Sequence, residues 1–203
     1  MKYFQFKYLL QHEGWQQNVY LKIDDKGIIQ SLSISPPDDA VSIEYINGFA
    51  LPGFQNAHSH AFQFGMAGMA EKHEPGTTDD FWSWREAMYA CALSMNPDEM
   101  EQVATACYKQ MLQKGYTHVA EFHYLHHDEN GKPYNNLAEM GERLLSAAAN
   151  AGIKITLVPV FYQKGNFGKD PLPQQRRFIS QTIDDYFQLL DDTAHAVSKF
   201  SNA

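Results

Sequence analysis

Apolar and polar residues alternate in short runs through the first part of the chain, and this spacing of two is typical of half-buried β-strands. The runs are YFQFKYLL, NVYLKIDDKGIIQSLSI and VSIEYI, with breaks at Asp25, Gly27, Pro36 and Pro37. Within the middle run, DDKG between two β-rich segments predicts a hairpin. We therefore expect residues 1–48 to form a small antiparallel β domain.

From Gly48 onward the rhythm changes to apolar runs that are separated by longer stretches with helical spacing. The apolar runs predict strands at residues 49–57, 118–124 and 154–161. Strands that alternate with helices indicate βα units and a parallel sheet. The fold class that we expect for this part of the chain is therefore α/β.

The segments between these strands predict four helices, at residues 79–93, about 96–114, 136–151 and from near 173 past 190. Asn96 and Pro97, followed by two acidic residues, form a helix-start signal. Gly115 and Gly152 stand where a helix should end ahead of the next strand. The order helix, glycine, strand therefore occurs twice.

Residues 49–203 are too few for a complete (β/α)8 barrel, which typically needs roughly 250 residues. Three βα units cannot close a barrel, and they would leave an open parallel edge that an independent domain rarely tolerates. We therefore expect residues 49–203 to be the N-terminal portion of a TIM-type barrel, truncated after its first three βα units.

The composition is that of an ordinary globular protein, with 44% hydrophobic, 13% aromatic and 20% charged residues. A formal net charge of -8 disfavours nucleic acid and anionic membranes as partners, because both require clustered basic residues. A small-molecule substrate is expected instead. The sequence shows no secretory signal and no apolar run of about 20 residues, and Cys91 and Cys107 form no disulfide framework. We therefore expect a cytoplasmic protein.

The sequence Asn56-Ala57-His58-Ser59-His60 ends the first apolar run after Gly48. Residues two apart in a strand point to the same face, so the two imidazoles can chelate one cation. Neutral imidazole suits borderline divalent ions such as Zn²⁺. The alternative is two surface histidines near a turn, but active sites of barrels lie at the C-terminal ends of the strands. The pattern thus predicts part of a metal site.

At this point the sequence resembles a known family. The run LPGFQNAHSHAFQFGMAGMAE resembles the first-strand motif of the amidohydrolase superfamily. The segments DDFWSWREAMY, GYTHVAEFHYLHHD, VPVFYQKGNFG and PLPQQRRF are similar to the formimidoylglutamate deiminase branch of that superfamily. The resemblance covers nearly all of the chain from about Gly48 and is weaker before it. It implies that residues 1–48 belong to a composite β-sandwich beside the barrel. It also implies that the complete protein is a homodimer.

The resemblance also implies one divalent metal, normally Zn²⁺, held by two histidines of a His-x-His motif, a later histidine and a later aspartate. His58 and His60 match the first two ligands, and we expect the other ligands and the catalytic acid/base beyond Ala203. The implied reaction is hydrolytic deamination of N-formimidoyl-L-glutamate to N-formyl-L-glutamate and ammonia, in histidine degradation. The 203-residue chain by itself is expected to be inactive.

Three further residues match substrate contacts of the family, each with a structural alternative. Gln63 could bond a substrate amide or amidine, or be an exposed loop residue. Arg85, among aromatic residues, could hold a substrate carboxylate, or pair with Glu86. Tyr124 could bond the glutamyl part or serve only as a core aromatic residue.

Two other functional hypotheses remain. A related amidohydrolase that deaminates a purine, pyrimidine or triazine would share the histidine pair without needing Arg85, and an inactive truncated remnant would lack the later ligands.

A second cation is conceivable at a polar cluster, but the favoured interpretation is that His123 or Glu121 supports the metal-binding histidines by hydrogen bonding. The cluster comprises Glu121, His123, His126, His127 and Asp128. Arg176 and Arg177 are expected to be surface or interface groups.

Overall fold

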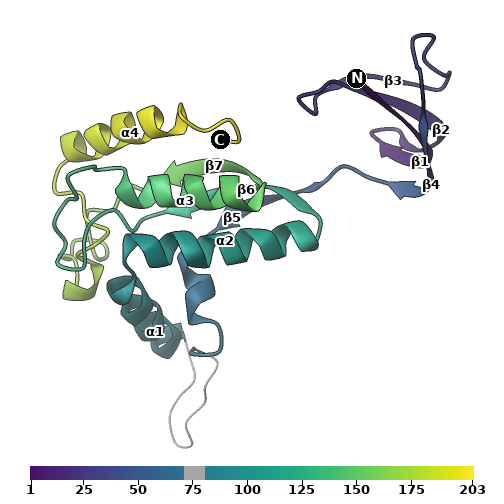
Figure 1. The fold of residues 1–203 in the computed structure, drawn as a ribbon. Helices are drawn as coiled ribbons and strands as arrows, with labels where there is room; N and C mark the ends of the chain where they lie inside the picture. The colour runs from purple at the N-terminus through teal and green to yellow at the C-terminus, as the bar shows by residue number, and fades with distance from the viewer. Residues whose placement is uncertain (71–80) are drawn as a thin grey trace, which may run out of the picture. The chain divides into compact units, whose positions relative to one another are not determined.

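A computed structural model describes residues 1–70 and 81–203, which divide into two compact units, Met1–Gly53 and Phe54–Ala203. The first unit is a four-stranded sheet with the strand order β3-β2-β1-β4 (Figure 1). Its strands are β1 (Lys2–Gln11), β2 (Gly14–Ile23), β3 (Ile29–Ser33) and β4 (Glu44–Ala50).

The predicted DDKG hairpin is confirmed between β2 and β3, which pair antiparallel. The carboxylate of Asp24 accepts hydrogen bonds from the backbone N–H groups of Lys26 and Ile28, and Gly27 adopts a φ of 81°. The expectation of a wholly antiparallel sheet is wrong, because β4 pairs parallel with β1. Residues 34–43 carry the chain from β3 at one edge to β4 at the other, and β4 then runs in the direction of β1.

The second unit contains a parallel sheet with the order β5-β6-β7. Its strands are β5 (Phe54–Ser59), β6 (Tyr116–His123) and β7 (Lys154–Pro159). The single strand expected at residues 49–57 is wrong, because β4 ends at Ala50 and β5 begins at Phe54. Pro52 lies in the interruption, and a proline has no N–H to donate to a ladder.

Helices connect these strands, so the predicted α/β class is confirmed; that the sheet belongs to a larger barrel stays a prediction. The elements are the 3-10 helix η1 (Ala61–Met66), α1 (Phe81–Ser94), α2 (Pro97–Gln113), α3 (Glu139–Ala151), the 3-10 turn η2 (Pro173–Gln175) and α4 (Ile183–Val197). The expected start of α1 at residue 79 lies outside the described residues. Within residues 1–70 and 81–203, no helix has the length and apolar character needed to span a membrane.

The helix ends follow their sequence signals, with one exception. The side chain of Asn96 accepts from the N–H of Glu99, whose carboxylate accepts from the N–H of Asn96, which closes a capping box at the start of α2. The helix expected from near residue 173 begins only at Ile183, where Thr182 and Asp185 form a second capping box. Pro173 starts the 3-10 turn η2 rather than an α-helix.

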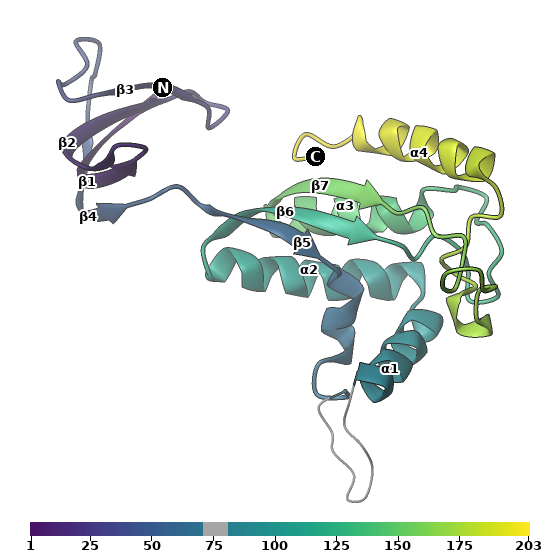
Figure 2. The same cartoon turned by 180° about the vertical axis from the view of Figure 1, so that it is seen from behind.

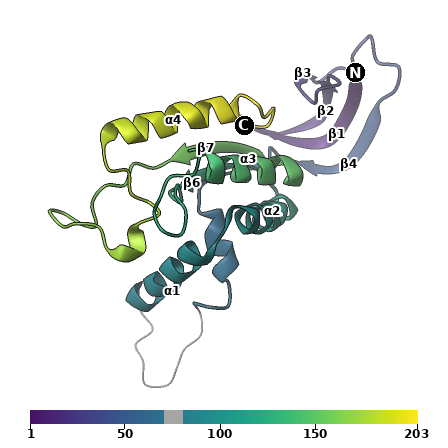
Figure 3. The same cartoon turned by 60° about the vertical axis from the view of Figure 1, so that its left-hand side comes forward.

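Helices α2 and α3 lie side by side against one face of the β5–β6–β7 sheet, and α4 runs beside α3 (Figures 1 and 3). The view from behind shows the sheet in front of α3 (Figure 2). Strand β6 alternates accordingly, with Val119, Glu121 and His123 buried and the residues between them less buried. Between sheet and helices lies a core of fully buried side chains that includes Tyr108, Val119, Met140, Leu144, Leu145, Ile153 and Ile155.

The expectation that Arg177 is a surface or interface group is wrong, because this residue has 0% exposure within the chain itself. Its guanidinium donates to the carbonyls of Ala92 and Met95, at the C-terminal end of α1, and to the carbonyl of His127. A cation is favourable where the last carbonyls of a helix lack partners. Arg177 therefore connects the C-terminal end of α1 to the loop that follows β6 by hydrogen bonds to both.

Replacing Arg177 with methionine is expected to lower the free energy of unfolding by about 3 kcal/mol, because buried carbonyls lose their donor. Arg176→Met is the matched control, since Arg176 is exposed and its two backbone bonds can be replaced by water. The control should cost less than about 1 kcal/mol. Urea unfolding of both variants checks this; equal losses would show that the burial of Arg177 is unimportant.

Candidate active site

A β-bulge near the end of β5 shapes the backbone around His58. Asn56 lies opposite Val119, and Ser59 lies opposite Glu121, so three steps along β5 face two steps along β6. The side-chain oxygen of Asn56 accepts a hydrogen bond of 3.2 Å from the N–H of His58. Because bulges re-aim side chains, this irregularity sets the direction of the histidine.

The Nε2 atoms of His58 and His60 lie 3.0 Å apart, and the two rings are nearly perpendicular, with an interplanar angle of 89°. Nδ1 of His60 lies 2.8 Å from the carbonyl oxygen of Phe122. A carbonyl can only accept, so Nδ1 carries the hydrogen and Nε2 presents its lone pair toward His58. Both rings also contact the ring of Phe122.

This arrangement fits two ligands of one divalent cation. Zinc binds imidazole nitrogen at about 2.0–2.1 Å, which places two tetrahedral ligands about 3.3 Å apart, close to the observed 3.0 Å. Burial lowers the pKa of His60, which favours the neutral ring that a metal requires. In the part of the chain that the structure describes, no cluster of three histidine, cysteine or carboxylate side chains is suited to a metal. Within those residues, the pair would supply two ligands of such a cation.

Gln63 and Tyr124 are brought together beside this pair. The side-chain amide of Gln63, on η1, donates a hydrogen bond of 3.1 Å to the hydroxyl of Tyr124, just after β6. The Tyr124 ring lies 5.0 Å from the ring of His60. Burial raises the pKa of Tyr124, so its hydroxyl stays protonated at neutral pH. It points to the Met88 sulfur at 4.0 Å, a weak acceptor.

Arg85 lies on α1, one turn before Met88. Its guanidinium stacks over the Trp82 ring at 4.4 Å and lies 5.7 Å from the centre of the Tyr89 ring. The buried Nε forms no hydrogen bond within residues 1–70 and 81–203, and in the same residues no ion pair joins Arg85 to Glu86. The same helix thus carries both Arg85 and Met88, whose sulfur the Tyr124 hydroxyl approaches.

Gln175, for which no role could be inferred from the sequence, lies next to Tyr89, whose ring the Arg85 guanidinium approaches. This buried amide donates to the hydroxyls of Tyr89, at 3.0 Å, and Tyr162, at 2.7 Å. Its oxygen accepts from the N–H of Leu172. Gln175 therefore ties the loop after β7 to the aromatic surface next to the guanidinium. Only the motif PLPQQRRF marked this segment, and the motif did not reveal these partners.

The polar cluster from Glu121 to Asp128 is not gathered into a group of three possible metal ligands in the described part of the chain. Glu121 and His123 point to the helix side of β6, whereas Phe122 and Tyr124 contact the histidine pair from the other side. His126 binds the carbonyl of Val160, and burial lowers its pKa to about 4. Among the described residues, neither Glu121 nor His123 hydrogen-bonds to the ring of His60, which the carbonyl of Phe122 orients instead.

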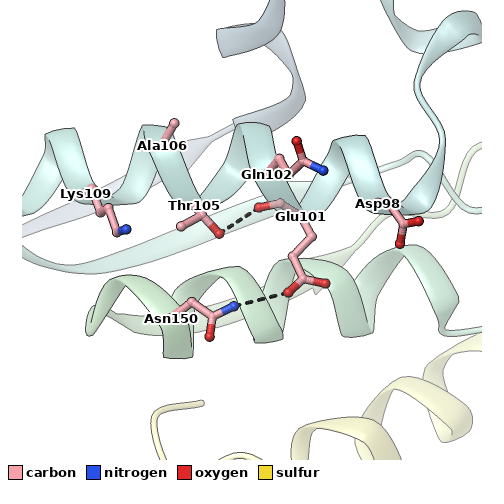
Figure 4. Close-up of a pocket in the computed structure, with 7 residues that line it drawn as sticks. All are labelled: Asp98, Glu101, Gln102, Thr105, Ala106, Lys109 and Asn150. Carbon is pink, nitrogen blue, oxygen red and sulfur yellow. Dashed lines mark hydrogen bonds between the residues drawn. The ribbon is translucent and has the colours of Figure 1, made fainter.

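A surface hollow of about 560 Å³ lies elsewhere, between α2 and α3 (Figure 4). Glu101 spans it by accepting a hydrogen bond from the side chain of Asn150, and the hydroxyl of Thr105 donates to the carbonyl of Glu101. The hollow is on the helix side of the sheet, and its lining includes no histidine.

Comparison with known proteins defines the class to which this fold and site belong. Residues 49–199 match the amidohydrolase family. The chain therefore belongs to the amidohydrolase family. It is 44% identical over 179 residues to formimidoylglutamate deiminase of Pseudomonas aeruginosa, a match that covers 88% of this chain and 39% of that protein. The resemblance inferred from the sequence is thereby confirmed.

Solved structures support the same fold. An amidohydrolase from Brucella melitensis is 40% identical with a TM-score of 0.89, covering 100% of this chain and 44% of the other. Guanine deaminase from C. acetobutylicum with bound guanine is 19% identical with a TM-score of 0.63, covering 99% and 43%. At the lower identity the likeness concerns the fold alone. This chain spans about two fifths of the length of these relatives.

Proposed function

We propose that the protein to which this chain contributes is a metal-dependent deiminase that converts N-formimidoyl-L-glutamate and water into N-formyl-L-glutamate and ammonia, in histidine degradation. The observation that carries the proposal is the pair of imidazole Nε2 atoms, 3.0 Å apart, on the side of β6 where Tyr124 and Gln63 also meet. The similarity to formimidoylglutamate deiminase supports this choice of substrate.

His58 and His60 would hold one divalent cation, which we expect to be Zn²⁺. Such an ion, when bound, lowers the pKa of a coordinated water toward neutrality and so supplies the nucleophile. The part of the chain described here orients the ligands: the Phe122 carbonyl fixes the tautomer of His60, and the bulge at Asn56 directs His58. Such outer partners are important for metal affinity.

Gln63, Tyr124 and Arg85 would bind the substrate. The Tyr124 hydroxyl already accepts from Gln63, so its own hydrogen is available to a stronger acceptor than the Met88 sulfur. The Arg85 guanidinium is stacked on Trp82, with an unbonded Nε among the described residues, and would bind a substrate carboxylate. The neighbouring aromatic rings would exclude water from this contact.

The remaining architecture follows from the resemblance. Residues 49–203 would provide the first three βα units of a (β/α)8 barrel, and residues 1–48 would join a composite β-sandwich. The later metal ligands and the general acid/base would lie beyond Ala203, so the 203-residue chain alone should not turn over. We expect the complete enzyme to be a cytoplasmic homodimer.

Ammonia release from N-formimidoyl-L-glutamate by the uninterrupted gene product tests the proposal. We expect turnover that a chelator abolishes and that added Zn²⁺ restores, because the cation activates the attacking water. Matched incubations with the chelator already saturated by Zn²⁺ control for effects of the chelator on the protein. A folded, zinc-loaded protein that releases no ammonia would refute the choice of substrate.

The principal alternative is a related amidohydrolase that acts on a purine, pyrimidine or triazine. Guanine deaminase shares the fold, but a ring substrate has no carboxylate to bring to Arg85. The aromatic setting of this arginine, with the guanidinium over Trp82, therefore favours an acidic substrate. An inactive remnant remains the other alternative, and the ammonia assay separates it from both enzymes.

A further inference from the structure

Glu121 is a buried carboxyl residue, 2% exposed, on the side of β6 that faces the helices. Its Oε1 accepts a short hydrogen bond of 2.6 Å from the backbone N–H of Ala61. Ala61 directly follows His60 and is the first residue of η1. The carboxyl group therefore binds the backbone immediately after the second histidine. It does not reach the face of the sheet on which the imidazoles lie.

This bond replaces a helix cap that the local sequence does not provide. The residue in the N-cap position of η1 is His60, and its side chain makes no capping hydrogen bond. Its ring is instead directed to the Phe122 carbonyl. Free N–H groups at the start of a helix need an acceptor. Glu121 supplies that acceptor from the neighbouring strand, so His60 is free to present its ring.

A second acceptor acts at the other end of the motif. The side-chain oxygen of Asn56 accepts from the N–H of His58 inside the bulge. Between these two points lies Ser59, which is buried and is the register partner of Glu121. The backbone of the three-residue His-Ser-His segment is thus held at its first residue and directly after its last one.

The burial of Glu121 is difficult to explain by stability alone. Burial raises its pKa to about 7, although the N–H of Ala61 and the hydroxyls of Ser59 and Tyr108 partly offset the effect. Its Oε2 makes no hydrogen bond of normal geometry to any residue in 1–70 or 81–203. A partly satisfied buried carboxyl costs free energy that an apolar side chain would not. Its well-formed bond is the one beside His60.

We infer that Glu121, together with Asn56, is a positioning residue that holds His58 and His60 in the conformation that chelates the cation. The inference rests on the proposed metal-dependent function. Glu121 acts only through the backbone and is not itself a ligand.

Zinc affinity of the uninterrupted protein, measured by competition with a chromogenic chelator, tests this role. Glu121→Ala should lower the affinity 10- to 100-fold, the range known for outer partners of metal ligands. Glu121→Gln keeps an oxygen acceptor and should stay within about threefold of the wild type. Asn56→Ala should weaken binding as well, and Asn56→Asp should restore it. The last two variants keep the test valid if Glu121→Ala fails to fold.

Leu145→Ala is the matched control, because Leu145 is fully buried in α3 and its truncation lowers stability without touching the bulge or η1. It should lower the unfolding temperature and leave zinc affinity unchanged. Hydrogen exchange of the peptide that spans residues 56–66, followed by mass spectrometry of the zinc-free protein, gives a second readout. Exchange should accelerate in Glu121→Ala and stay at the wild-type rate in Leu145→Ala.

The outcomes separate this inference from the proposed function. If wild-type protein neither binds zinc nor releases ammonia, the proposed function is wrong, and the positioning role is wrong with it. If the wild type does both, but Glu121→Ala binds zinc as tightly or Glu121→Gln loses as much affinity as Glu121→Ala, only the positioning role is overturned. Unchanged exchange of the 56–66 peptide in Glu121→Ala overturns it too.

Discussion

Replacing His60 with alanine in the uninterrupted protein is expected to reduce kcat/KM for N-formimidoyl-L-glutamate by about 10³-fold or more, and to remove tight zinc binding. The Nε2 of this ring faces the Nε2 of His58 at 3.0 Å, and the Phe122 carbonyl fixes the ring in that orientation. Loss of one member of the pair therefore removes half of the chelate. His58→Ala should have a similar effect. Ammonia release and metal content of the purified protein provide the measurements.

His118 offers a control from the same sheet. It lies in β6, and its Nε2 is 2.9 Å from the hydroxyl of Thr156. We expect His118→Ala to keep its zinc and most of its activity, because this ring has no part in the chelating pair. Turnover and zinc content that survive His60→Ala would show that the cation is bound elsewhere, and that the pair is only a structural contact.

The elements that the sequence predicted well are those with local signals. The helix start at Asn96 and the helix end at Gly152, with a φ of 85°, depend on a few neighbouring residues and could be inferred from them. Features that depend on distant partners could not. The parallel pairing of β4 with β1 is set by the path of the whole first unit. The burial of Arg177 depends on carbonyls more than 40 residues away.

The same distinction applies to the candidate site. The His-x-His spacing is a local pattern, and the two rings do lie within chelating distance. The function of Glu121 could not be inferred, because it depends on the bulge that brings Ser59 opposite this residue. Alternation within β6 alone placed Glu121 and His123 together on one face, but did not show that this face is turned away from His58. Strand alternation therefore needs the register of the neighbouring strand before it can assign a residue to a site.

The choice between an acidic and a ring substrate depends on Arg85, and Arg85→Met is expected to reduce kcat/KM for N-formimidoyl-L-glutamate by about 10²–10³-fold. A charge-assisted hydrogen bond contributes about 1.5–3 kcal/mol, and a planar guanidinium can form two to one carboxylate. The group is prepared for this contact, because it is stacked on Trp82 and its buried Nε has no hydrogen-bond partner within residues 1–70 and 81–203. Arg85→Lys should recover little, since an ammonium cannot form the paired bonds.

Substrate analogues show whether the loss comes from a carboxylate. In the wild type, conversion of either substrate carboxylate to an amide should lower kcat/KM; in Arg85→Met, one of the two conversions should have almost no further effect, because its binding partner is already missing. Glu86→Gln is the control for a structural ion pair and should leave the kinetics unchanged. If Arg85→Met discriminates among the analogues as the wild type does, the arginine does not hold a carboxylate. The preference for a dicarboxylic substrate would then lose its structural support, and guanine-like or triazine-like rings would become the substrates to assay.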